Sequence, residues 1–151
     1  MLRTRLSDTL KSSMKERNER SVSTLRLILA ALKDQDIAAR GKGNMEGLTD
    51  DQILSLLQSM IKQRRESIKL YEQGGRMELA QREAEEIGVI EEFLPEQMSD
   101  DEMATVITAI IGEVGATSLK DMGKAMGALK EQYPGQMDFA KASALVKERL
   151  G

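Results

Sequence analysis

Apolar side chains recur every three or four residues along most of the chain, and this period constrains the fold more than any other feature. In residues 20–40, for example, Leu25, Ile28 and Leu32 fall on one side of a helix. No segment alternates Val, Ile or Thr with polar residues as a half-buried strand does. The sequence therefore predicts an all-α protein.

Capping and turn residues divide the pattern into helices. About four are expected before Pro95, over roughly residues 2–18, 20–40, 50–73 and 76–94. Three more are expected after it, opened by Ser99, Ser118 and Asp138. The short segment from Pro95 to Gln97 then separates an N-terminal helical domain, 1–94, from a small three-helix domain, 98–151.

Composition excludes several kinds of chemistry. The 151 residues include no Cys and no His, which removes disulfides, thiolate or imidazole metal sites and catalysis by either residue. With no Trp, two Tyr and two Phe, the core must be built from Leu, Ile, Val, Ala and the ten Met. We expect no cofactor, no metal and no catalytic residue.

The longest apolar run, Leu27 to Leu32, is too short to cross a bilayer. We therefore expect a soluble, cytoplasmic protein with no membrane partner. Residues 1–20 are basic and place Leu2 and Leu6 on one side, as an organelle transit peptide does, but acidic residues such as Asp8 argue against that alternative.

Charge is uneven along the chain. Residues 1–44 carry ten Lys and Arg against five Asp and Glu, whereas residues 45–97 carry six against twelve. These charges either steer an anionic partner or pair with each other across packed helices, and we favour pairing for most of them.

Residues 118–130 hold the sharpest candidate site. Gly123 and Gly127 lie one helical turn apart beside Lys120 and Lys124. Because each glycine inside a helix costs about 1 kcal/mol relative to alanine, two on one stripe indicate that another backbone approaches closely. The pattern favours a helix of the same module packing into this glycine groove. The alternatives are an RNA phosphate or sugar edge held by the two ammonium groups, and a protein partner.

This segment, with Leu94-Pro95-Glu96-Gln97 before it and the run from Leu145 to Leu150 after it, resembles the GatB/YqeY family. The run from Ser23 to Ile28 and that from Lys62 to Ser67 with Tyr71 also resemble the YqeY pattern, so the resemblance covers nearly the whole chain. The family includes small bacterial YqeY-like proteins and the tail domain of GatB, the B subunit of the glutamine-dependent amidotransferase acting on misacylated tRNA. Two positions depart from the pattern: Gly88 replaces a better helix former, and Gln136 stands where relatives commonly carry a basic residue.

The resemblance implies a GatB-tail-like C-terminal domain and an accessory function associated with tRNA or another structured RNA. Its link is to glutamine-dependent carbon–nitrogen ligation, whose chemistry resides in other domains. The expected RNA-contacting residues are Lys120, Gly123, Lys124 and Gly127, assisted by Lys141, Lys147 and Arg149, with Arg64 and Arg65 as a second site. The main alternative is a helical adaptor that docks on a protein without nucleic acid.

Two further segments are interpreted without function. The glycine-containing run from Gly41 to Gly47 follows a helix and lacks a Gly-Lys-Ser/Thr ending, so we expect a flexible linker rather than a phosphate loop. An acidic cluster could serve a stand-alone enzyme, but its spacing around a helix favours a solvated face. The cluster consists of Glu83, Glu85, Glu86, Glu91 and Glu92.

Overall fold

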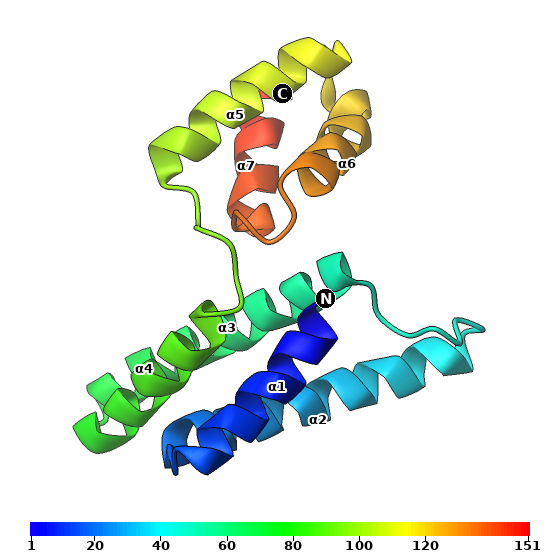
Figure 1. Cartoon of the computed structure of the whole chain (residues 1–151). Helices are drawn as coiled ribbons and strands as arrows, with labels where there is room; N and C mark the ends of the chain where they lie inside the picture. The colour runs from blue at the N-terminus through cyan, green and yellow to red at the C-terminus, as the bar shows by residue number, and fades with distance from the viewer. The chain divides into compact units, whose positions relative to one another are not determined.

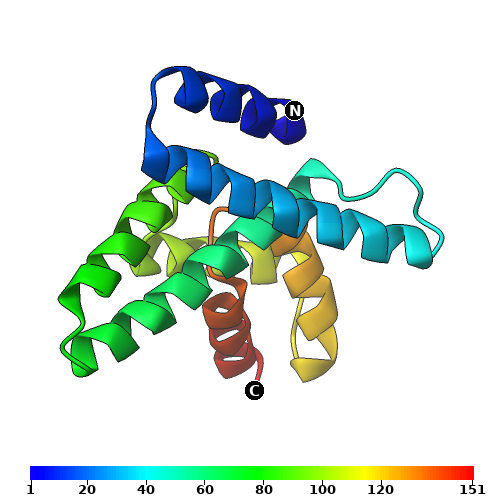
Figure 2. The same cartoon turned by 90° about the horizontal axis from the view of Figure 1, so that it is seen from below.

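The computed structural model describes all 151 residues and contains helices but no strands (Figures 1 and 2). The predicted all-α class is confirmed. The elements are α1 Leu2–Lys15, α2 Glu19–Gly41, α3 Asp50–Gln73, α4 Met77–Glu91, α5 Asp100–Val114, the short 3-10 helix η1 Leu119–Asp121, α6 Met122–Gln132 and α7 Phe139–Leu150. The chain divides into two compact units, Met1–Leu94 and Pro95–Gly151.

In the N-terminal unit, α1 packs along α2, and α3 and α4 form a hairpin across Gly74 and Gly75 (Figure 2). Aliphatic side chains from all four helices fill its core. Leu6, Leu25, Ile28, Ile53, Leu57 and Ile90 are fully buried. Full burial of each such side chain contributes about 1.5 to 3 kcal/mol, which holds these helices together.

In the C-terminal unit, α5, α6 and α7 surround a second core. Its fully buried residues include Ile107, Ala125, Leu129 and Val146. No single helix of the protein is long and apolar enough to cross a membrane. Taken together, α5 and the bent continuation formed by η1 and α6 are long and apolar enough for a membrane span. Their apolar residues, however, are those that fill this core.

Most helix ends follow the capping residues. Thr49 and Gln52 form the expected capping box, Ser99 accepts the N–H of Glu102, and Asp138 accepts those of Ala140 and Lys141. The first helix ends at Lys15, earlier than predicted, because the backbone turns into the left-handed region at Arg17, where φ is 58°. The helix expected from Ser118 begins as η1, a tighter turn of the kind common at helix starts.

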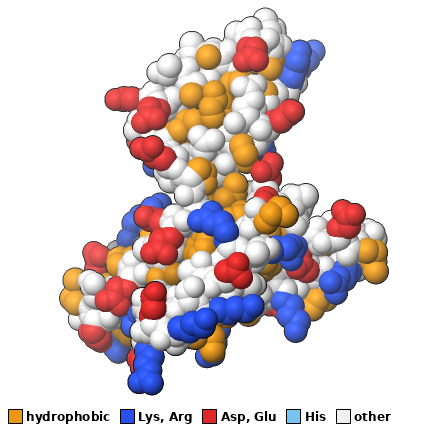
Figure 3. All heavy atoms as spheres, in the orientation of Figure 1, with side chains coloured by type: hydrophobic (Ala, Val, Ile, Leu, Met, Phe, Trp, Pro, Cys, Tyr) orange, Lys and Arg blue, Asp and Glu red, His pale blue; other side chains and the backbone are white.

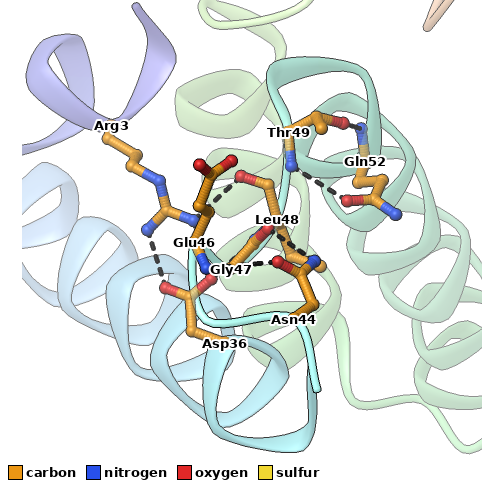
Figure 4. Close-up of polar contacts among 8 residues, drawn as sticks. All are labelled: Arg3, Asp36, Asn44, Glu46, Gly47, Leu48, Thr49 and Gln52. Atoms are coloured by element: carbon orange, nitrogen blue, oxygen red, sulfur yellow. Dashed lines mark hydrogen bonds and ion pairs between the residues drawn. The ribbon is translucent and has the colours of Figure 1, made fainter. Parts of the chain in front are cut away.

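A hydrogen-bonded cluster fixes the end of the loop between α2 and α3 (Figure 4). The Arg3 guanidinium donates to both Asp36 carboxylate oxygens, each at 2.7 Å, and to the Leu48 carbonyl at 2.9 Å. Asp36 also accepts the Leu48 N–H at 2.9 Å. The hydrogen bond from Arg3 is the largest factor that lowers the pKa of Asp36 to about 2. The end of the loop from Gly41 to Gly47, for which a flexible linker was expected, is held by these bonds to Leu48 and by one from the Asn44 side chain to the Gly47 carbonyl.

Gly47 is required by this cluster. Its φ is +81°, in the left-handed region, and the residue is buried. A Cβ at Gly47 would overlap the Asp36 carboxylate and lie 3.0 Å from an Arg3 guanidinium nitrogen.

Candidate nucleic-acid interface

Helix α6 turns its two glycines away from the core. Ala125 and Leu129 are fully buried, whereas Gly123 and Gly127 are exposed on the opposite side of the helix. A Cβ built on either glycine would meet no atom within 4 Å. The expectation that a helix of the same module packs into a glycine groove is therefore wrong, because α5 and α7 contact the other face of α6.

The two lysines beside the glycines are also accessible. Lys120 and Lys124 are exposed, and neither forms an ion pair. Asp121 interacts electrostatically with Lys124, but its carboxylate accepts the backbone N–H groups of Thr117 at 2.8 Å and Ser118 at 3.3 Å. These hydrogen bonds, that of Thr117 first, lower the pKa of Asp121 and direct its charge toward the helix start.

One residue of this face was missed by the sequence reasoning. Lys130 is exposed and follows Gly127 by three residues, which places it on the same side of α6. That spacing was the signal that could have found it. Lys120, Gly123, Lys124, Gly127 and Lys130 are called the α6 ridge below. Glu131 is the one exposed carboxylate of α6 and reduces the positive charge of the ridge at its end.

The three predicted basic residues of α7 are not all brought to this ridge. The end of α7 lies beside η1. A Cβ built on Gly151, for example, would be 4.0 Å from the Leu119 side chain. Lys147 and Arg149 occupy that last turn and are exposed. Lys141 lies in the first turn of α7 and makes a 3.9 Å ion pair with Asp100, so it is further from Lys120 along the helix.

The expected second site is altered by the structure. The Arg64 side chain is only 12% exposed and donates to the Glu86 carboxylate at 2.8 Å and to the Met60 carbonyl at 3.2 Å. An arginine held in this way is not free to contact a phosphate, so the interpretation of Arg64 as an RNA-contacting residue is withdrawn. Arg65 is 65% exposed and makes a 3.8 Å ion pair with the exposed Glu91. Of the two arginines of the expected second site, only Arg65 therefore stays at the surface.

The same contact corrects the interpretation of the acidic cluster. Glu86 is buried rather than solvated, because Arg64 from α3 and Arg82 one turn earlier on α4 supply its partners. Glu85, Glu91 and Glu92 are exposed. No group of three or more acidic side chains in the protein has an arrangement that could hold a metal ion.

Comparison of the sequence with known proteins gives a family match that covers both units. The family model described as Yqey-like protein matches residues 3–150. An uncharacterized protein of Schizosaccharomyces pombe is 32% identical to this chain over 91 residues, which cover 60% of this chain and 70% of that protein. Because the family match includes nearly every residue of α1 to α7, the chain belongs to the Yqey-like protein family.

Proposed function

We propose that this protein is a non-catalytic accessory protein that binds RNA, in the first place tRNA, through the α6 ridge. The observation that carries the proposal is the open ridge itself: two exposed glycines with no atom within 4 Å of their Cβ positions, flanked by lysines without ion pairs. A helix that only needed to pack would gain stability from alanine at both positions. The ridge keeps the glycines and leaves its backbone accessible to a ligand.

The chemistry of the ridge suits a nucleic-acid backbone. Its ammonium groups can contact phosphates, and the missing side chains allow a sugar or phosphate to approach the helix closely. No aromatic side chain belongs to the ridge, so we expect contacts to the RNA backbone rather than stacking on bases. Lys147 and Arg149 are exposed in the last turn of α7, the end that lies beside η1, and Glu148 between them is also exposed.

The resemblance to the GatB tail supports the same use of the C-terminal unit. In this proposal the protein helps to hold tRNA while carbon–nitrogen ligation with glutamine as amido donor occurs elsewhere. The chain has no Cys or His with which to release ammonia from glutamine, which is consistent with a role without catalysis.

The test is a double charge reversal, Lys120→Glu with Lys124→Glu, in the full-length protein. A matched control is Lys11→Glu with Lys15→Glu on α1, because both residues are exposed, four apart and without ion pairs. Binding to bulk tRNA is measured by filter binding or anisotropy between low and physiological salt. We expect the ridge variant to bind at least tenfold more weakly and its salt slope to fall by about 2, while the control keeps the parent slope within about 0.5. If the ridge variant binds tRNA as tightly as the parent at low salt, the proposal is wrong.

A second candidate function, a helical adaptor for another protein, is favoured by a different observation. Large apolar side chains are exposed on the N-terminal unit, including Leu27 at 49% and Ile37 at 54%. Contiguous apolar surface is typical of sites that take a partner, and Ile37 shares one groove with Leu29. Pull-down followed by nuclease treatment separates the two functions, because an adaptor keeps its partner whereas an RNA binder loses the material that RNA carries.

A further inference from the structure

A groove of about 320 Å³ lies between α1 and α2 in the N-terminal unit, whereas the α6 ridge belongs to the C-terminal unit. Leu29, Leu32 and Ile37 of α2 form its apolar floor. Leu32 belongs to the core and is 4% exposed, whereas Ile37 is 54% exposed. The floor therefore continues from the hydrophobic core to the surface of the protein.

Lysine and arginine side chains border this floor along one edge of α2. Lys33 and Arg40 both line the groove and are seven residues apart, which places them on nearly the same side of the helix and about 10.5 Å apart along its axis. Arg26 continues the row by the same spacing in the other direction. All three are exposed and none forms an ion pair, although Arg20 on the same helix pairs with Glu85 at 3.1 Å.

The carboxylate in the groove pairs with Arg3 and attracts Arg40 more weakly, through space. Asp36 lines the groove, but its oxygens are taken by the Arg3 guanidinium and the Leu48 N–H. Each charge of the pair offsets the other, so the groove keeps the two positive charges of Lys33 and Arg40. On the face drawn in Figure 3, Lys and Arg side chains of the N-terminal unit lie among hydrophobic and acidic side chains.

We propose that this groove docks an acidic amphipathic helix of a partner protein. Aliphatic side chains spaced at i, i+3 or i+4 and i+7 on that helix would cover Leu29 and Ile37, and its carboxylates would meet Lys33, Arg40 and Arg26. The docking site supplies a surface and a partner chemistry for the adaptor function, and it does not depend on RNA binding by the α6 ridge.

The aliphatic floor decides between a protein and a nucleic acid. RNA-binding surfaces that read bases place aromatic or arginine planes where bases stack, and the floor of this groove holds only leucine and isoleucine. Phosphate contact by itself would gain nothing from an exposed isoleucine. A helix with one acidic and one aliphatic side complements both parts of the surface.

The test uses a synthetic 18-residue amphipathic peptide with leucines at helical spacing and glutamates flanking them. One comparison peptide has the same composition in an order without an apolar face, and another replaces each Glu with Lys. Fluorescence anisotropy measures binding to the full-length protein and to three variants. These are Lys33→Glu with Arg40→Glu, Ile37→Ser, and a control, Lys62→Glu with Lys69→Glu, whose exposed residues on α3 are also seven apart.

We expect the acidic amphipathic peptide to bind the parent and the control equally. The Lys33 and Arg40 variant should weaken binding at least tenfold, and Ile37→Ser about fivefold, because one removes the charge attraction and the other the exposed floor. A milder pair, Lys33→Gln with Arg40→Gln, serves if charge reversal disturbs the fold, which circular dichroism detects.

Three results would overturn the proposal. The first is equal binding of the amphipathic and reordered peptides, and the second is an equal loss of binding in the α3 control. The third is that the Lys33 and Arg40 variant loses binding to a hairpin RNA, while the acidic peptide binds the parent and every variant with the same affinity. That result would make the groove a nucleic-acid surface. The RNA proposal is tested by tRNA binding to the Lys120 and Lys124 variant, and the groove proposal by peptide binding to the Lys33 and Arg40 variant. Either proposal can therefore fail while the other stands.

Discussion

Replacing the two ridge glycines with alanine tests separately what they cost in stability and what they contribute to RNA binding. Gly127 lies in the middle of α6, so Gly127→Ala should raise the free energy of unfolding of the C-terminal unit by about 1 kcal/mol. Gly123 is the second residue of the helix, where the gain should be about half as large. No atom lies within 4 Å of either added Cβ, so no steric clash opposes these gains. The double variant should be more stable by about 1.5 kcal/mol.

The assay uses the distribution of tyrosines. The chain has no Trp and two Tyr, of which Tyr71 lies on α3 and Tyr133 directly follows α6. In a Tyr71→Phe background, the fluorescence of Tyr133 reports unfolding of the C-terminal unit in the full-length protein. With a urea dependence near 1 kcal/mol per M for a unit of this size, the double variant should move the midpoint up by about 1 to 1.5 M.

The same variant should bind tRNA more weakly, because two methyl groups would stand where the RNA backbone approaches. We expect a loss of about fivefold to tenfold at low salt. Gly112→Ala is the control, since Gly112 is also exposed in a helix of the same unit with no atom within 4 Å of its Cβ position. It should add stability without changing tRNA binding.

Two results would refute this reasoning in different ways. Unchanged or reduced stability would mean that the ridge is not open as described. Raised stability with unchanged tRNA binding would mean that the glycines do not serve close approach of RNA, even if the lysines still contact phosphates.

Three further predictions concern the N-terminal unit, and urea denaturation checks each of them. Arg64→Ala should lower stability by about 3 kcal/mol, because it removes the closest partner of a buried carboxylate, whereas Arg65→Ala should change it by less than about 0.5 kcal/mol. Equal effects would contradict the difference in burial. Gly47→Ala should lower stability by about 2 kcal/mol or more, since φ is +81° and the Cβ overlaps the Asp36 carboxylate. The Asp36 pKa falls from 3.8 to about 2 on folding, so its contribution is complete above about pH 4 and is lost as pH falls through about 2. Allowing for the 41% exposure of Arg3, that contribution is about 1 to 2 kcal/mol, and Asp36→Asn should remove the corresponding pH dependence.

The parts of the fold that were predicted depend on neighbours in the sequence. The capping box of Thr49 and Gln52 and the cap at Asp138 involve groups two or three residues apart, so the sequence contains both partners of each contact. The helical period likewise identifies the buried side of α2, including Leu25, Ile28 and Leu32. These local rules explain why helix type and most helix ends were correct.

The parts that were missed depend on residues far apart in the chain. Arg3 and Asp36 are separated by 33 residues, and Arg64 and Glu86 by 22, so no local pattern shows that they meet. Arg64 therefore resembled a free surface cation, and Glu86 a solvated carboxylate. The packing of α4 against α3 brings the two side chains together and contradicts both interpretations.

For the candidate site, the sequence alone determined that two glycines and two lysines share one short segment at helical spacing, because their spacing is a property of the helix itself. It could not determine whether that side faces a neighbouring helix or solvent. Only the packing of α5 and α7 against Ala125 and Leu129 decided the matter, because burial depends on which elements meet in space. In the groove between α1 and α2, the apolar floor and the basic edge both belong to α2, so their spacing also follows from the sequence. Only the packing of α1 against α2 decided that they border a groove.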